Sequence, residues 1–318
     1  MSERMKILLA YDGSACADHA IEDMQRAGLP AEADALVVAV EEVWLPAPPM
    51  SSYEIVEKMV LPEGQVATQM APVAGFRAED SEAYKLAEEA QRKIQRLFPA
   101  WQVTIKCAIG SPATEVLRIA DEWKPDLIVV GSHGRTALGR FFFGSVSHKI
   151  VTEAHATVRV SRCAETNGVE KEKLLIAVDG SMNAETAIQT VAHRQFPAET
   201  EARVVIVTDP LKPSLVGAFI PRVSEWVDES NKDERNWARD TARQQAEILN
   251  RAGFLASYAV REGDPRRELI REAEDWNATT IFVGARGLNT VDRFLLGSVS
   301  AAIAQRAECT VEIVRPKT

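Results

Sequence analysis

The sequence predicts an α/β protein built from two tandem doubly wound parallel five-stranded sheets flanked by helices. Three observations lead to this prediction: apolar, β-branched runs alternate with helical segments, the whole order occurs twice, and each copy is long enough to bury its own core. The chain has 318 residues, which suits about two domains of roughly 150 residues each. We therefore expect one domain over residues 1–163 and a second over residues 171–318.

The internal repeat is clearest in two pairs of motifs. Asp12-Gly13-Ser14 recurs as Asp179-Gly180-Ser181, at an offset of 167 residues. Gly131-Ser132-His133-Gly134 recurs as Gly284-Ala285-Arg286-Gly287, at an offset of 153 residues. The first copy therefore holds 14 extra residues between its two motifs. We expect them in a long, proline-rich surface loop within residues 44–75.

Within each copy, apolar runs alternate with segments whose apolar residues recur at helical spacing. This alternation predicts parallel strands joined by helices on both faces of a sheet. The expected strands cover residues 6–10, 35–40, 102–108, 127–130 and 157–161, and then the run ending at Ala177, 203–207, 255–261, 280–283 and 310–314. The expected helices contain residues 17–24, 79–97, 112–123 and 145–153, and then 184–191, 229–251, 265–276 and 298–306.

Several helix ends can be assigned from residue type. Ser14 and Ser181 suit the N-cap of the first helix in each copy, and Gly28 suits the end of the first one. Ser111 and Asp264 are each followed by proline, the combination expected of an N-cap and a first helical turn.

The last strand of each copy is expected to lie at the edge of its sheet. No helix follows either strand to cover that edge, and a short polar linker over residues 162–172 joins the two copies. We therefore expect the two units to pair through residues 157–161 and 310–314, around a pseudo-twofold axis.

Each copy carries glycines between its fourth strand and its last helix. A strand that runs into a glycine turn and then into a helix N-terminus can cradle an anion, because glycine lets the backbone come close and the first helical N–H groups point at the ligand. The pattern G-x2-G-x9-G-S is met by Gly131, Gly134, Gly144 and Ser145, and again by Gly284, Gly287, Gly297 and Ser298. In a doubly wound sheet these residues would face Asp12 and Asp179 across one crevice at the carboxyl ends of the strands.

Two such loops beside two Asp-Gly-Ser strand ends resemble the universal stress protein family, in its tandem form, over essentially the whole chain. The resemblance implies that the chain binds adenine nucleotide, ATP, in one or both units and acts in the stress response as a sensor or regulator. The implied contacts are Ala10, Asp12, Ala177 and Asp179 with ribose and adenine, the backbone of Val40 and Val207 with adenine, and the glycine loops with Ser145, Val146, Ser298 and Val299 around ribose and phosphates. Asp12 and Asp179 could also help to hold Mg²⁺ beside the phosphates.

Two other functions are compatible with this fold. An interaction scaffold would leave the crevices empty or fill them with another small molecule, and it would capture its partner after both loops were mutated. A subunit like an electron-transfer flavoprotein shares the architecture, but the sequence offers no flavin site.

Other residues of the loops have more ordinary interpretations. Cations stand at two matched pairs of positions: His133 with Arg286, and Arg140 with Arg293. They could pair with phosphates, although arginines are common in surface loops. The apolar runs 141–143 and 294–296 are expected to pack the loops onto the domain or onto the other unit.

The composition excludes several classes of protein. A net charge of −9 argues against nucleic acid as the main partner, because such binding depends on Lys and Arg neutralising phosphates. No apolar run approaches the ~18 to 20 residues of a membrane-spanning helix, and no targeting segment is visible. The cysteines show no CxxC spacing: Cys16, Cys107, Cys163 and Cys309. We expect a cytoplasmic protein without a metal site or disulfides.

The sequence gives little support for catalysis. It has neither a GxxxxGK[ST] P-loop nor a Ser-Gly-Gly turn after the first strand. We therefore expect no enzymatic activity beyond slow hydrolysis of bound ATP. Association of two chains into a homodimer is left open.

Overall fold

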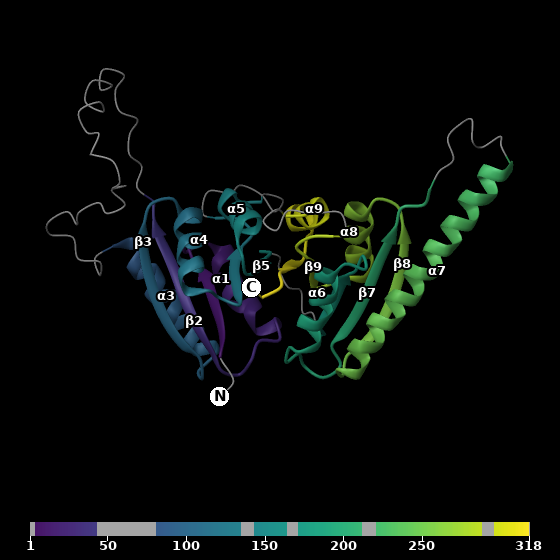
Figure 1. Cartoon of the computed structure of the whole chain (residues 1–318). Coiled ribbons are helices and arrows are strands. Elements are labelled where there is room, and N and C mark those ends of the chain that lie inside the picture. The colour runs from purple at the N-terminus through teal and green to yellow at the C-terminus, as the bar shows by residue number, and fades with distance from the viewer. Residues whose placement is uncertain are drawn as a thin grey trace, which may run out of the picture.

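The computed structural model of the chain describes residues 4–42, 81–134, 143–163, 171–211, 221–287 and 296–317 (Figure 1). The expected loop at 44–75 lies outside them. The first half contains β1 (Met5–Ala10), α1 (Ala15–Asp23), the 3₁₀ turn η1 (Met24–Arg26), β2 (Ala33–Glu41), α3 (Glu82–Leu97), β3 (Gln102–Ile109), α4 (Pro112–Trp123), β4 (Leu127–Gly131), α5 (Ser145–Glu153) and β5 (Thr157–Ser161). The second contains β6 (Lys173–Ala177), α6 (Met182–Ala192), β7 (Glu201–Thr208), α7 (Pro221–Arg251), β8 (Leu255–Glu262), α8 (Pro265–Trp276), β9 (Thr280–Gly284), α9 (Ser298–Arg306) and β10 (Thr310–Val314).

The strands form one sheet of ten, in the order β3-β2-β1-β4-β5-β10-β9-β6-β7-β8. All pairs within a half are parallel, so each half is a doubly wound unit of five strands and the predicted α/β fold is confirmed. The two halves meet where β5 and β10 pair antiparallel, with Arg159 opposite Glu312. This is the edge at which we expected the units to associate, and the result is a single continuous sheet.

Helices cover the sheet on both faces. The helices α1 and α3 pack on one face of the first half, and α6 and α7 pack in the same way on the second. The helices α4, α5, α8 and α9 share the opposite face, and their buried side chains form one apolar cluster that crosses from one half to the other. On this face the core is therefore continuous across the seam between β5 and β10, whereas each half has its own apolar cluster on the other face.

Two helix ends differ from the predictions. The long helix α7 begins at Pro221, eight residues before the expected position, and Figure 1 shows its first turns reaching beyond the sheet. Among the side chains described in its first turns, Val227 alone is buried, so the apolar spacing there was too sparse to predict a helix. The helix α1 ends at Asp23 and tightens into η1, so Gly28, with φ of +62°, lies beyond its end.

The predicted caps are largely present. Ser14 Oγ accepts from the Ala17 N–H at 3.1 Å, and Ser181 Oγ accepts from the Ala184 N–H at 3.3 Å. Asp264 caps α8 through its side chain, and Ser111 is the N-cap residue of α4, as predicted, but makes no side-chain cap hydrogen bond. The Ser111 backbone is extended as an N-cap requires, and Pro112 occupies the first turn.

A buried ion network crosses the seam. Arg159 of β5, fully buried, donates to Asp23 Oδ2 at 2.7 Å and to Glu312 Oε2 at 3.2 Å. Arg194, after α6, donates to the same Glu312 carboxylate at 2.8 Å. Burial alone would raise the pKa of Asp23, but the Arg159 guanidinium and its hydrogen bond outweigh this and hold the pKa below its usual value.

Candidate functional site

The candidate site lies where the strand order reverses in each half. The strand β1 has β2 on one side and β4 on the other, and β6 has β7 and β9. Helices leave the sheet in opposite directions at such a switch point, so ligands of doubly wound folds bind at the carboxyl ends of these strands. Asp12 follows β1 and Gly131 ends β4, and Asp179 and Gly284 take the same places in the second half.

The aspartates are fixed by the turns that follow the first strands. Asp12 Oδ1 accepts from the Ser14 N–H at 3.0 Å, and Asp179 Oδ1 accepts from the Ser181 N–H at the same distance. In each half the second carboxylate oxygen faces the glycine loop, because an added Cβ at Gly134 would lie 2.7 Å from Asp12 Oδ2. The equivalent atom at Gly287 would overlap Asp179 Oδ2.

The first glycine of each loop is required by close packing. A Cβ at Gly131 would lie 2.9 Å from the Cys16 carbonyl carbon, in the first turn of α1. A Cβ at Gly284 would lie 2.9 Å from the Asn183 carbonyl carbon in α6. Because these neighbours are backbone atoms, neither position can accept a side chain without moving a helix.

The second Gly-Ser of each loop starts a helix. Gly144 N–H donates to Ser132 O and Gly297 N–H donates to Ala285 O, both at 2.8 Å. The N-cap residues are Gly144 and Gly297, and among the residues that the structure describes no side chain caps α5 or α9, so no side-chain oxygen there accepts from their first N–H groups. The exposed Ser145 stands at this end of α5, and Ser298 opens α9.

One matched pair of side-chain hydrogen bonds at the site was not predicted from the sequence. Ser147 Oγ donates to Gly131 O and Ser300 Oγ donates to Gly284 O, both at 2.7 Å. Each bond ties the new helix to the end of the preceding strand and so fixes the loop between them. The signal was present in the sequence, since Gly-Ser-Val-Ser occurs in both copies and its second serine is as constant as its first.

Backbone groups at the carboxyl ends of β2 and β7 face the switch point of their own half. Val38 O accepts from the Tyr11 N–H at 2.9 Å on the β1 side, whereas Glu41 O accepts from the Gly110 N–H at 3.0 Å on the β3 side. Lateral backbone groups alternate along a strand, so the N–H and C=O of Val40 point toward β1, which has already ended at Ala10.

The second half repeats this arrangement. Val205 O accepts from the Val178 N–H and Thr208 O accepts from the Gly263 N–H, so Val207 presents its backbone groups beyond the end of β6. Within the described ranges, the backbone groups of Val40 and Val207 have no hydrogen-bond partner, so each residue offers a donor and an acceptor beside a strand end, which suits the edge of a planar heterocycle. The remaining predicted side chains make the surroundings apolar: Ala10, Val146 and Val299 are partly buried against the central core cluster, and Ala177 belongs to it.

Of the four loop cations considered above, one is seen to turn its side chain away from the switch point. The His133 ring lies against α1, with Nε2 at 3.3 Å from Cys16 Sγ and Nδ1 at 3.1 Å from Ser132 Oγ. Arg286 meets α6 through its carbonyl, which accepts from Asn183 Nδ2 at 3.2 Å. Arg140 and Arg293 lie outside the described residues.

The apolar runs of the two loops are described only at their ends. Phe143 and Leu296 pack against the central core cluster, as predicted, and Arg162 lies over the Phe143 ring at 5.5 Å. The other residues of these runs are outside the part of the chain that the structure describes.

The sequence model of the universal stress protein family matches the chain twice, over residues 3–162 and 171–315. The chain belongs to the universal stress protein family. Among its relatives, universal stress protein Mb2028c of Mycobacterium bovis is 28% identical over 246 residues, covering 73% of this chain and 74% of that protein. Universal stress protein MJ0531 of Methanocaldococcus jannaschii is 29% identical over 161 residues, covering 49% of this chain and 80% of that protein.

Solved structures share the tandem architecture of this universal stress protein. A universal stress protein from Archaeoglobus fulgidus superposes on this chain with a TM-score of 0.61 and 18% sequence identity. The match covers 98% of this chain and 96% of that one. At that identity the likeness concerns the fold alone. Of the helices described in this chain, none has the length and apolarity to cross a membrane. Within the described ranges, no three His, Cys, Asp or Glu side chains are grouped so that they could hold a metal ion.

Proposed function

We propose that this universal stress protein binds adenine nucleotide, ATP, at the switch point of each half, and that it acts as a nucleotide-dependent sensor or regulator in the stress response. One binding unit would span residues 1–163 and the other residues 171–318. The observation that carries the proposal is the cradle formed twice by a Cβ-free glycine facing an aspartate carboxylate, beside an uncapped helix N-terminus.

Each part of the nucleotide has a matching group. The backbone of Val40 or Val207 would pair with the edge of adenine, as the unpaired donor and acceptor there allow. Asp12 or Asp179 would accept from the ribose hydroxyls, since its second carboxylate oxygen faces the loop. The phosphates would lie at the N-termini of α5 and α9, where N–H groups and the helix dipole favour negative charge.

Magnesium would enter with the phosphates. The oxygen ligands that Mg²⁺ prefers are supplied by phosphate, water and one or two carboxylates, which fits a single aspartate per site. Bound Mg²⁺ would neutralise phosphate charge. Asp12 and Asp179 would hold the ion and the ribose in place, and we propose a protein that retains ATP and hydrolyses it slowly at most.

The test is calorimetric titration of ATP into the nucleotide-free full chain. We expect Gly134→Ala and Gly287→Ala each to remove one site, because the new methyl group meets only the end of an aspartate side chain and leaves the helices in place. Gly253→Ala, far from both loops, is a stringent control: a Cβ there meets nothing within 4 Å, but the φ of +98° strains any side chain, so a loss of binding caused by general destabilisation would appear in this variant too. No measurable affinity of the wild-type chain for ATP would overturn the proposal and favour an interaction scaffold.

A further inference from the structure

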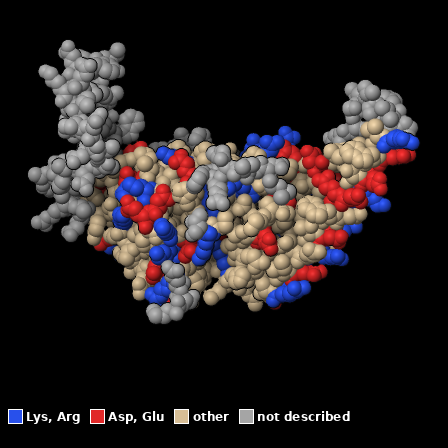
Figure 2. All heavy atoms as spheres, in the orientation of Figure 1, with Lys and Arg blue, Asp and Glu red and all other residues tan. Residues whose placement is uncertain are grey.

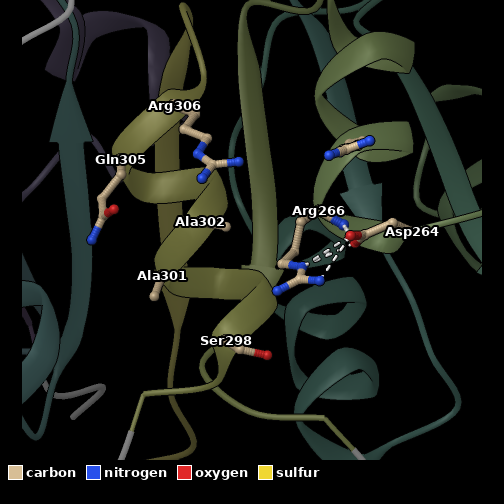
Figure 3. Close-up of a pocket in the computed structure, with 8 residues that line it drawn as sticks. Asp264, Arg266, Ser298, Ala301, Ala302, Gln305 and Arg306 are labelled. Carbon is tan, nitrogen blue, oxygen red and sulfur yellow. Dashed lines mark hydrogen bonds and ion pairs between the residues drawn. The ribbon is translucent and has the colours of Figure 1, made fainter.

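A charged groove lies beside the second switch point, between α8 and α9 (Figure 3). Its volume is about 440 Å³, within the ~300–1,000 Å³ usual for small-molecule sites. The residues that line it are Asp264, Arg266, Arg267, Ser298, Ala301, Ala302, Gln305 and Arg306. Along α9 the groove is lined by two small residues, Ala301 and Ala302, and the Ser298 hydroxyl lies at one end of it.

The groove carries an excess of positive charge. Arg266 is paired with Asp264, Nη2 to Oδ2 at 2.8 Å, and Figure 3 shows its guanidinium between the two helices. Among the described residues, the guanidinium groups of Arg267 and Arg306 make no hydrogen bond or ion pair, although the charge of Arg267 is felt by the Asp264 carboxylate. Three arginines against one aspartate leave two uncompensated cations in one groove, and Figure 2 shows Lys and Arg gathered over α8 and α9.

The fold does not require these arginines. At the offset of 153 residues, Arg266 and Arg267 correspond to Ala113 and Thr114, and Arg306 corresponds to Glu153. In the first half the place of Ala302 is taken by Lys149, which donates to Thr114 Oγ1 at 3.1 Å, so one lysine and one glutamate leave the groove between the same two helices nearly neutral. Like charges repel, so a cluster of arginines that packing does not need is explained best by an anion that they bind.

We infer that the groove binds a linear polyphosphate, in first place the phosphate tail of the nucleotide whose base lies at the Asp179 switch point. This inference rests on the proposed function for its nucleotide source. Ser298 belongs both to the groove and to the uncapped start of α9, so phosphates that begin at this helix continue directly into the groove. Guanidinium groups bind phosphate oxygens in pairs, which makes each further phosphate a further contact.

The consequence is a difference between the two halves. The second site discriminates between nucleotides by their number of phosphates, whereas the first site, without the arginines, does so weakly. A monophosphate would end near Ser298 and leave Arg267 and Arg306 unpaired. One half would thus report the ATP to AMP ratio and the other would report total adenine nucleotide.

The experiment compares the full chain with Arg267→Gln/Arg306→Gln and with a charge-matched control, Arg243→Gln/Arg251→Gln on the exposed face of α7. ATP, AMP and inorganic tripolyphosphate are titrated into each at two salt concentrations. We expect the groove variant to lose about tenfold or more in ATP affinity at one site, with AMP binding unchanged, because each charged hydrogen bond to a phosphate is lost. The control variant should behave as wild type.

The tripolyphosphate titration separates the possible sources of the anion. If tripolyphosphate binding depends on Arg267 and Arg306 while the ratio of ATP affinity to AMP affinity does not, the groove binds a free polyphosphate. If wild type binds neither nucleotide, the proposed function fails, and the tripolyphosphate result alone decides whether the groove binds anions. The inference is overturned if Arg267→Gln/Arg306→Gln changes neither the ratio of ATP affinity to AMP affinity nor the binding of tripolyphosphate.

Discussion

Replacing Arg159 with methionine tests whether the seam between the halves is a single folded unit. Arg159 is fully buried, and its guanidinium is held by Asp23 at 2.7 and 3.2 Å and by Glu312 at 3.2 Å. Glu312 would keep Arg194 as a partner, but the hydrogen bonds left to Asp23 among the described residues would come from the hydroxyls of Ser161 and Thr310, which carry no charge. Breaking a buried pair in this way costs about 3–5 kcal/mol, because one charge stays buried without compensation.

The expected change in melting temperature follows from the size of the unit that unfolds. At ~2.1 cal/mol/K per residue, unfolding of all 318 residues together has an entropy near 0.7 kcal/mol/K, so Arg159→Met should lower the midpoint by about 4–7 °C. Arg4→Met, which removes a half-exposed pair with Glu32, should cost about 0–1 kcal/mol.

Scanning calorimetry and urea unfolding of the full chain measure this effect. Adding Asp23→Asn to Arg159→Met removes the orphaned charge and should recover about 1–3 kcal/mol, which a loss of packing alone would not allow. Two results would contradict the seam as an integral part of the fold. One is a free energy of unfolding of Arg159→Met within 1 kcal/mol of the wild-type value, and the other is two separate unfolding transitions in the wild-type chain.

Three further outcomes are expected. The depressed pKa of Asp23 stabilises the chain above the unfolded value of about 3.9, and this contribution is lost as pH falls through the lower folded value, so acid unfolding below about pH 4 should be less steep in Asp23→Asn. Gly131→Val should destabilise by about 1–3 kcal/mol, seen in urea, because its side chain would meet the backbone of α1. In a thiol titration at pH 8, the exposed Cys163 should react ahead of Cys16 and Cys309, since burial raises the pKa of both to about 12; equal rates would contradict this.

Much of the fold could be predicted from the sequence because the same order of strands and helices occurs twice. Runs such as 157–161 and 310–314 were assigned to their final bounds, since a match between two copies confirms a short apolar pattern that is ambiguous alone. The start of α7 was not predicted, because Val227 is the one buried residue among the described side chains of its first turns, and a helical stretch without an apolar face has no periodic pattern.

The seam shows where sequence reasoning stops. In the run 157–161, polar residues alternate with valines, so Arg159 has the pattern of a solvent-facing side chain. Its burial depends on β10, α1 and Arg194, which come from distant parts of the chain. The same holds for the groove, where Arg267 and Arg306 are brought together only by the packing of α8 beside α9.

Side-chain direction was equally inaccessible. His133 stands at a position that suits a phosphate contact, yet its ring turns to Cys16, because the first turn of α1 lies within reach of the loop. The close packing of Gly131 and Gly284 and the turn hydrogen bonds of Asp12 and Asp179 were predictable, since both depend on backbone geometry, which the spacing of the motif encodes.

Native mass spectrometry of the full chain in ATP tests the central claim most directly, because it counts bound nucleotides one molecule at a time. We predict two ATP per wild-type chain, one in Gly134→Ala, one in Gly287→Ala and none in the double variant. A wild-type chain that carries no ATP, or variants that keep both, would contradict the assignment of one nucleotide site to each half.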